Sequence, residues 1–301
     1  MRALVISGGG SKGAFAGGVA QYLLQEQRLT YDLFLGTSTG SLLISHLALE
    51  KIEKIRQVYT SVNQHRIFSN CPFTIHRKYG VATIGINHWN VLRNLLRGSN
   101  TFGESHNLLK LIRNTLTPDE FRALQEGPTE LLVTVSNLSL NQVEYKSVND
   151  FSYEDFCEWI WISCNYIPFM SLVRKNGCEY ADGGLGCMVP IEEAIHRGAR
   201  VVDAIILHTE VTHLNRMPSK NPFSLLTNMF GFMLDRIEEH NVKIGKFTAN
   251  YQDALINFYY TPTILTTNSL VFDKEQMAKW WKSGYLYAAS RSAESSELGP
   301  G

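Results

Sequence analysis

Two strand–glycine–helix units follow one another at the start of the chain. An apolar run over residues 2–7 stops at Gly8–Gly10, and helical spacing of apolar residues follows over 13–27. A second apolar run, 33–35, leads into Gly36–Gly40 and another helical stretch. Repeated units of this kind place strands parallel to each other with helices on both faces. We therefore predict an α/β fold with three layers, α/β/α, and a mostly parallel central sheet.

The remainder of the chain continues this mixture. Strands are predicted over 131–135, 143–146 and 201–207, and helices over 153–164, 222–246 and 274–290. The stretch from about 68 to 103 is interrupted by glycine and proline and is interpreted as an insertion or cap. Without a repeat or linker, residues 1–291 are expected to form one domain, and 292–301 a disordered tail.

Composition excludes several classes of protein. Lys plus Arg equals Asp plus Glu, 28 of each, so a nucleic-acid surface is not expected. Arg93, Arg97 and Lys110 give only weak local basicity, and we interpret them as solvated charges. The five cysteines lack Cys-x-x-Cys spacing, which argues against a zinc site or disulfide framework. Neither a signal peptide nor a transmembrane segment is recognisable, so a soluble cytoplasmic protein is expected.

The first glycine loop, Gly8–Gly13, admits three interpretations. It satisfies G-x-G-x-x-G between a strand and a helix, with Asp32 about twenty residues on, as a dinucleotide site would. Asp32, however, precedes its strand, whereas the ribose-binding acid of such sites follows one. The same backbone could instead hold an oxyanion through convergent amides and the helix N-terminus, or serve only as a turn.

The second loop, Gly36–Gly40, matches G-x-S-x-G between a strand and a helix. That context is typical of a nucleophile elbow, in which Ser38 occupies a sharp turn that needs small neighbours. A serine hydroxyl needs a base. Late histidines are candidates by chain order, and His208 is the best placed because it ends the strand 201–207. The full set of candidates is His196, His208, His213 and His240.

A third motif, Asp182-Gly183-Gly184, follows a short segment with strand character. Taken alone, it is most simply an Asp-Gly turn. Combined in this order with the two glycine loops, it resembles the patatin-like phospholipase family, whose pattern is G-G-G-x-[RK]-G, G-x-S-x-G and D-G-[GA]. The resemblance includes Ser163–Pro168 and spans at least residues 2–200. It is closest to bacterial-type patatin-like serine acyl hydrolases.

The resemblance implies a patatin-like fold and a site without histidine, metal or cofactor. Ser38 would be the nucleophile and Asp182 its base, and the first loop would form the oxyanion hole. The other residues that it implies are Gly8, Gly9, Gly10, Ser11, Lys12 and Gly13 of that hole, Gly36 and Gly40 of the elbow, and Gly183 and Gly184 beside the base. This chain departs from the family in having Cys164, Asn165 and Tyr166 where alanines are common, and Met188 where an asparagine is common.

The implied activity is hydrolysis of fatty-acyl esters by a phospholipase A or lysophospholipase type of enzyme, through an acyl-enzyme. Partners would be phospholipids or other fatty-acyl esters, with peripheral membrane contact as an option. Apolar stretches over 223–234 and 159–170 could form an interfacial face, or could be core and pocket lining. An acyltransferase that uses the same serine and a non-catalytic lipid-binding protein remain the alternatives.

Overall fold

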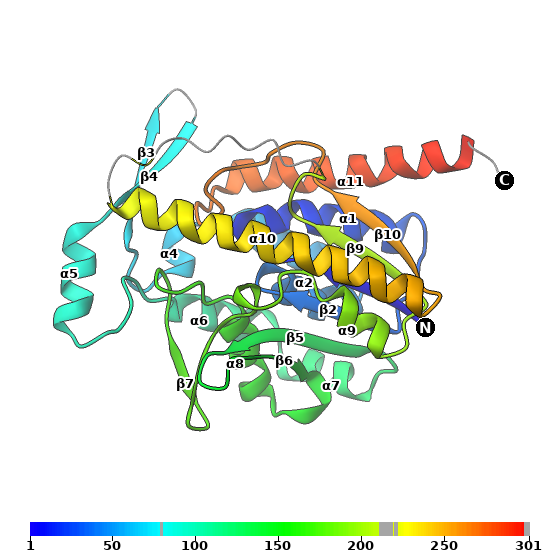
Figure 1. Ribbon diagram of the computed structural model, residues 1–301, viewed down its shortest axis with the longest axis horizontal. Helices are drawn as coiled ribbons and strands as arrows, with labels where there is room; N and C mark the ends of the chain where they lie inside the picture. The colour runs from blue at the N-terminus through cyan, green and yellow to red at the C-terminus, as the bar shows by residue number, and fades with distance from the viewer. Residues whose placement is uncertain (79–80, 211–218, 220–221, 298–301) are drawn as a thin grey trace.

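The computed structural model describes residues 1–78, 81–210, 219 and 222–297 (Figure 1). Over these residues the main sheet has eight strands, in the order β10-β9-β1-β2-β5-β8-β7, with β6 also paired to β5. The strands are β1 (Arg2–Ile6), β2 (Leu33–Thr37), β5 (Glu130–Asn137), β6 (Gln142–Ser147), β7 (Val173–Lys175), β8 (Cys178–Asp182), β9 (Val201–Ile206) and β10 (Leu255–Tyr260). Pairing is parallel from β10 through β5 and antiparallel for β6, β7 and β8. The mostly parallel α/β sheet predicted from the sequence is confirmed.

Alternation along the strands divides the core between the two faces of the sheet. Leu4 and Ile6 of β1 belong to one buried cluster, and Ala3 and Val5 belong to the other. The first face is covered by α1 (Gly13–Gln25), α2 (Thr39–Ala48), α3 (Ile52–Ser61), α6 (His106–Thr115), α7 (Pro118–Glu126), α8 (Tyr153–Ser163) and α11 (Lys274–Glu297). The second is covered by α9 (Ile191–His196) and α10 (Pro222–Tyr251), which crosses in front of the sheet (Figure 1). Helices therefore cover both faces, as three layers require.

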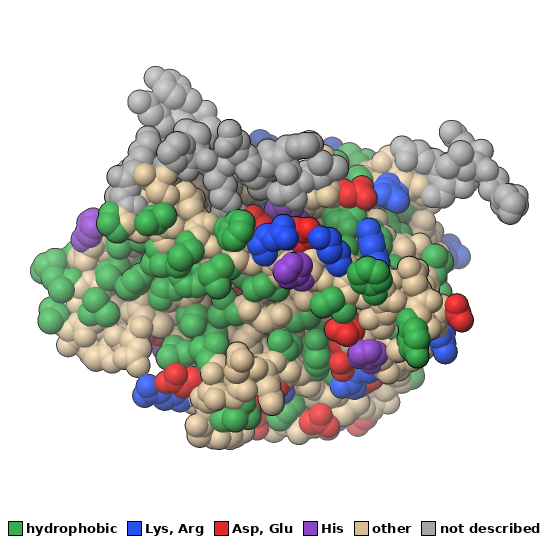
Figure 2. All heavy atoms as spheres, viewed as in Figure 1, with side chains coloured by type: hydrophobic (Ala, Val, Ile, Leu, Met, Phe, Trp, Pro, Cys, Tyr) green, Lys and Arg blue, Asp and Glu red, His purple; other side chains and the backbone are tan. Residues whose placement is uncertain are grey.

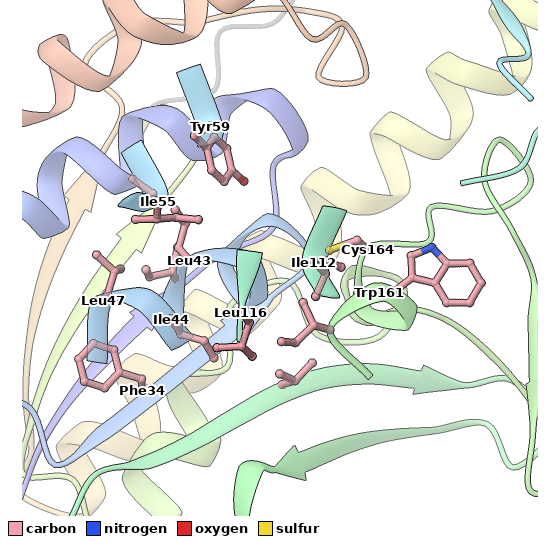
Figure 3. Packing of buried hydrophobic residues seen from close by; sticks show 14 of the residues in the cluster. Phe34, Leu43, Ile44, Leu47, Ile55, Tyr59, Ile112, Leu116, Trp161 and Cys164 are labelled. Atoms are coloured by element: carbon pink, nitrogen blue, oxygen red, sulfur yellow. The ribbon is translucent and has the colours of Figure 1, made fainter. Parts of the chain in front are cut away.

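The larger cluster centres on α2, the helix that follows the second glycine loop. Figure 3 shows its side chains Leu43, Ile44 and Leu47 lying between Phe34 of β2 and Ile55 of α3. All five are almost completely buried. Fully burying a side chain of this kind contributes about 1.5–3 kcal/mol, so α2 and the turn before it are firmly held.

The segment from about 68 to 103 stands apart from the main sheet. It contains an antiparallel hairpin, β3 (Phe73–Lys78) and β4 (Val81–Ile86), followed by α5 (His88–Leu96), at one end of the molecule (Figure 1). The short helix α4 (Gln64–Ile67) precedes it. The segment has its own secondary structure, and its function as a cap stays a prediction.

The C-terminal segment is more ordered than the sequence indicated. A disordered tail was expected from Ser292, but α11 continues through Glu297, and 298–301 lie outside the described residues. Ser292 Oγ accepts a hydrogen bond of 2.9 Å from Gln27 Nε2, which ties the helix to the segment after α1. A local sequence pattern does not predict this long-range contact.

No helix in the described part of the chain is long and apolar enough to cross a bilayer.

Candidate active site

Ser38 occupies a strained turn between β2 and α2. Its φ is 52°, a left-handed value that is uncommon for a residue with a side chain. Gly36 and Gly40 are needed at this turn: a Cβ on Gly36 would lie 2.5 Å from Gly40 C, and one on Gly40 would lie 2.2 Å from Ile6 O. At both glycines the backbone lies very close to another backbone segment. This close approach explains why the pattern requires glycine on either side of the serine.

Two strands bring Ser38 and Asp182 together by meeting end to end along β5. A strand has two hydrogen-bonding edges, and β6 occupies one edge of β5 over Leu132–Asn137. The other edge pairs with β2 as far as Thr37 opposite Thr134, and then with β8 from Asp182 opposite Val135. The residue that follows β2 therefore lies beside the residue that ends β8, although 144 positions separate them in the chain.

The Asp182 carboxylate receives a hydrogen bond on each of its oxygens. Ser38 Oγ donates to Oδ2 at 2.7 Å, and the Gly184 amide donates to Oδ1 at 2.8 Å. Gly183 lies so close to β5 that a Cβ there would be 2.3 Å from Thr134 O. The three residues of the Asp-Gly-Gly motif thus have different structural roles. Asp182 provides the carboxylate, Gly183 allows close approach to β5, and Gly184 directs its amide at the carboxylate.

Burial changes the acidity of this carboxyl group. Asp182 is only 5% exposed, and its desolvation raises the pKa to about 7, against the opposing effect of the hydrogen bonds from Ser38 and Gly184. An aspartate with a pKa near neutrality can exist as a carboxylate at physiological pH and can also accept a proton from a neighbouring hydroxyl. Its acidity is therefore suited to a general base.

Only part of the first glycine loop has amides available for a ligand. The Gly8 amide donates to Met188 O at 3.2 Å, the Ser11 amide to Ser269 O at 2.8 Å and the Lys12 amide to Gly9 O at 3.2 Å. The amide of Gly13 donates within the turn to Gly10 O, and the glycine itself lies against Thr39 and Tyr59. Among the described residues, the amides of Gly9 and Gly10 have no backbone acceptor.

The side chain of Lys12 connects the first glycine loop to the residue that follows β9. Its Nζ donates a hydrogen bond of 2.5 Å to Leu207 O at the end of β9. Burial lowers the pKa of this amine, and the nearby carboxylates of Glu238 and Asp235 on α10 oppose that effect. The side chain therefore links the glycine loop, β9 and α10, and its position indicates a supporting contact.

The histidine candidates that lie in the described residues do not pair with Ser38. His208 lines the same cavity, but its Nδ1 contacts Thr209 O at 3.2 Å and its Nε2 lies 3.6 Å from Asp235 Oδ1. His196 and His240 are exposed on α9 and α10, and His213 lies outside the described residues. The side chain that contacts Ser38 Oγ in the described part of the chain is the carboxylate of Asp182.

Several supporting contacts were not singled out by the sequence motifs. Ser163 Oγ accepts a hydrogen bond of 2.9 Å from the Ser38 amide, and Asn165 O accepts one of 2.9 Å from the Asp182 amide. The segment just before Pro168 thus holds Ser38 through the Ser163 side chain and Asp182 through the backbone of Asn165. Cys164 contributes as well, because its thiol contacts Ser38 O at 3.1 Å. No local signal in the sequence identifies these contacts.

This chain has Met188 where the family often has an asparagine, and an asparagine of α10 makes side-chain hydrogen bonds to this segment. Met188 packs its sulfur against Gly8 and Gly184, and its carbonyl accepts the Gly8 hydrogen bond. Asn241 of α10 provides the side-chain amide, since its Oδ1 accepts from the Met188 amide at 2.8 Å and from the Val189 amide at 3.3 Å. A helix distant in sequence therefore holds the segment behind the Asp-Gly-Gly turn.

A cavity of about 470 Å³ opens at the pair, within the usual size range of ligand pockets. Its walls include Gly8, Gly9, Gly10, Ser38 and Asp182. Apolar side chains of α2, α3, α6 and the hairpin contribute to the lining, among them Leu42, Ile55, Val58, Val62, Phe73, Ile84, Leu108, Leu111, Ile112 and Leu116. Polar side chains contribute as well, among them Lys12, His208, Asn228, Asp235, Glu238 and Asn268. Ser38 and Asp182 therefore line a cavity that offers both apolar and polar surface.

The two apolar stretches noted in the sequence differ in exposure. In the stretch 159–170, Trp159, Trp161, Phe169 and Met170 are buried, so this stretch is core and pocket wall. In the stretch 223–234, part of α10, some apolar side chains pack inward and others are exposed. Of the two, only the α10 stretch has exposed large apolar side chains that could meet a lipid surface.

A strand, a serine on a strained turn and a helix within a mostly parallel sheet form the arrangement typical of nucleophile elbows in α/β proteins. The Patatin-like phospholipase family model matches residues 4–195, more than half of the chain. The chain therefore belongs to the patatin-like phospholipase family, whose members are lipid acyl hydrolases.

Solved structures support the fold. The crystal structure of VipD from Legionella pneumophila aligns with a TM-score of 0.50 at 15% sequence identity, covering 96% of this chain. The chain spans 66% of the length of that structure, so VipD has a region with no counterpart here. At this identity the likeness concerns the fold. No curated protein sequence matches this chain.

Proposed function

We propose that this protein is a lipid acyl hydrolase of the phospholipase A or lysophospholipase type, acting through a Ser38–Asp182 dyad. Ser38 Oγ attacks the ester carbonyl while its proton passes to Asp182 Oδ2. The tetrahedral intermediate collapses with loss of the alcohol, which takes the proton, and leaves an acyl-enzyme on Ser38. Water then gives its proton to Asp182 and attacks the acyl-enzyme. The second tetrahedral intermediate collapses as Asp182 returns this proton to Ser38 Oγ, which releases the fatty acid and restores the serine.

The observation that carries this proposal is the hydrogen bond of 2.7 Å from Ser38 Oγ to Asp182 Oδ2. It joins the elbow serine directly to a carboxylate whose pKa is about 7. The distance lies within the range expected for a general base and the proton that it removes. No other side chain of the described residues makes a hydrogen bond to that hydroxyl.

The amides of Gly9 and Gly10 are the proposed donors to the oxyanion. They belong to a loop that lines the cavity together with Ser38, and a Cβ placed on neighbouring Gly8 would lie 3.4 Å from Ser38 Cβ. Gly10 has a φ of 55°, and a Cβ there would be 2.3 Å from Ser269 O, so its glycine is required by the loop. Preorganised amides of this kind are typically worth about 3 kcal/mol each in the transition state.

The mixed lining of the cavity supports a lipid ester as substrate. Apolar side chains such as Leu42 and Ile112 suit an acyl chain, because burying methylene groups against them removes these groups from water. Polar side chains such as Asn228 and Asn268 suit the headgroup side of the ester. The scissile carbonyl would then lie at Ser38.

We expect kcat/KM for a monomeric ester to rise with pH through a midpoint of about 7. The reason is that Asp182, with its pKa raised to about 7 by burial, must be unprotonated to accept the Ser38 proton. Activity is therefore low at pH 5 and reaches a plateau above pH 8. Initial rates measured from pH 5 to 9, with circular dichroism to show that the fold persists, test this. A flat profile across that range would contradict the assigned base.

The proposed function is tested by fatty-acid release from defined phospholipids, lysophospholipids and short-chain nitrophenyl esters, with His208→Ala as a matched variant. Wild type is expected to release acyl groups from at least one lipid class. His208→Ala is expected to stay within about tenfold of wild type, whereas a Ser–His mechanism predicts a loss of about 10⁴-fold or more. Inactivity toward every ester rejects the proposed function, and loss of activity in His208→Ala alone rejects the dyad.

A further inference from the structure

Helix α5 exposes an apolar stripe next to a basic one. Trp89, Leu92 and Leu96 lie at helical spacing i, i+3 and i+7, and Trp89 is 74% and Leu96 79% exposed. Arg93 and Arg97 follow Trp89 at i+4 and i+8 and are also exposed. The helix and its C-cap, residues 88–97, contain no acidic residue. In a chain with equal numbers of acidic and basic residues, this is a local concentration of positive charge beside apolar surface.

The opposite face of α5 is held against the rest of the segment 68–103. Val91 and Asn94 are buried, and Asn94 Nδ2 donates a hydrogen bond of 2.9 Å to Thr101 O. Asn90 Nδ2 donates another of 2.9 Å to Cys71 O. The outward orientation of the tryptophan and leucines is therefore imposed by specific polar contacts on the inner side.

The N-terminal half of α10 also exposes apolar side chains, next to the cavity. Thr227, Gly231 and Leu234 lie on one face of the helix and line the cavity. On another face, Met229 and Phe232 point outward, and Phe232 is 61% exposed. Residues 222–234 contain no charged side chain. One helix thus separates the cavity from an exposed apolar face.

We propose that these two helices form a docking surface for an anionic lipid bilayer, an inference that rests on the proposed function because it concerns how the substrate reaches Ser38. The apolar surface consists of the exposed side chains Trp89, Leu92, Leu95 and Leu96 of α5 and Leu225, Met229, Phe232 and Met233 of α10. Figure 2 shows hydrophobic side chains gathered over the half of this face where Figure 1 places α5 and the start of α10.

The chemistry of the surface favours anionic lipid as its occupant. Apolar side chains with tryptophan among them enter the boundary between headgroups and acyl chains, and arginines at the same level contact anionic headgroups. Large apolar patches are rarely left exposed on a monomeric protein without an interaction. Its continuity with the cavity wall through α10 lets a lipid ester approach the serine from the bilayer.

Tryptophan fluorescence offers a specific readout. The chain has five tryptophans, and Trp159, Trp161, Trp280 and Trp281 are at most 8% exposed, which leaves Trp89 as the one in contact with water. Binding to vesicles of phosphatidylcholine with phosphatidylglycerol is therefore expected to shift the emission to shorter wavelength. The measurement uses Ser38→Ala protein so that the vesicles are not degraded. In Trp89→Phe on this background the shift is expected to disappear while cosedimentation with vesicles remains.

The charge requirement is tested by Arg93→Gln/Arg97→Gln in the same background. Binding to anionic vesicles is expected to weaken by about thirtyfold, because two basic contacts with the lipid surface are lost. The matched control is Lys279→Gln/Lys282→Gln, which removes two exposed charges from α11 and should bind like its parent. Trp89→Ser/Leu96→Ser is expected to reduce binding to both anionic and neutral vesicles.

The outcomes separate this proposal from the proposed function. Hydrolysis of a monomeric nitrophenyl ester without any binding to anionic vesicles overturns the docking surface and leaves the hydrolase intact. Vesicle binding without hydrolysis of any ester supports the surface and overturns the function. Equal binding by the α5 and α11 charge variants overturns the assignment to α5. Self-association in analytical ultracentrifugation that Trp89→Ser/Leu96→Ser abolishes would assign the surface to a second copy of the chain instead.

Discussion

Replacing Ser38 with alanine is expected to lower kcat for ester hydrolysis by at least about 10⁴-fold, because alanine lacks the hydroxyl group that is the proposed nucleophile. The fold should persist. The Ser38 amide donates to Ser163, and its carbonyl accepts from the Ser41 amide at 2.9 Å and the Ser41 hydroxyl at 2.6 Å. These are backbone contacts that alanine retains. The left-handed φ is no more costly for alanine than for serine, because both carry a Cβ.

The measurement for Ser38→Ala combines acyl release with labelling by a fluorophosphonate, which reacts with activated serines. Wild type should be labelled and Ser38→Ala should not. Ser61→Ala is a matched control, since Ser61 is exposed on α3 away from the cavity and should be labelled like wild type. Equal labelling of Ser38→Ala and wild type would show that the reactive serine lies elsewhere.

Asp182→Asn is expected to produce the second large loss of activity, about 10³-fold or more in kcat, because an amide cannot accept the serine proton. Asparagine fits the same space. Its Oδ1 can keep the hydrogen bond from the Gly184 amide, and its Nδ2 can donate to Ser38 Oγ, reversing the direction of that bond. Loss of activity in this variant therefore reports on proton transfer rather than on misfolding.

The same substitution is expected to stabilise the protein at neutral and alkaline pH. Burial raises the pKa of Asp182 from 3.8 to about 7, so the folded state binds a proton that the unfolded state has released between these values. Stability is therefore lost as pH rises through this interval, and the buried carboxylate carries that cost above it. At 1.36 kcal/mol per pKa unit, Asp182→Asn can recover at most about 4 kcal/mol.

Thermal unfolding of wild type and Asp182→Asn at pH 4.5 and pH 8 measures this difference. The variant should gain Tm relative to wild type at pH 8 and gain much less at pH 4.5, where the wild-type carboxyl group is largely protonated in the fold. Other titrating groups are common to both proteins and cancel in the comparison. A gain that is the same at both pH values would contradict a raised pKa at this position.

Much of the architecture could be predicted because it depends on local sequence patterns. Apolar runs bounded by glycine predicted β1 and β2, and period and length predicted the long helices, although α10 and α11 extend further than expected. The family resemblance that the three glycine motifs carry implied the candidate dyad of Ser38 and Asp182. What local patterns lack is the contact between distant segments, such as Asn241 bonding the backbone beside Met188.

Exposure is the other property that the sequence could not supply. The stretches 159–170 and 223–234 look equally apolar, yet one is core and the other is partly exposed, because burial depends on which elements pack against a helix. Arg93 and Arg97 appeared as isolated solvated charges. Only the fold reveals that they run beside exposed Trp89 and leucines on one short helix.

The meeting of β2 and β8 along one edge of β5 has a consequence for how the protein matures. Ser38 is synthesised long before Asp182, and its elbow can form from local sequence and α2. The base arrives only when β8 docks opposite Val135, a contact of high sequence separation that is expected to form late in folding. A nascent or partly folded chain would then carry the serine without its proton acceptor, so completion of the sheet would itself activate the enzyme.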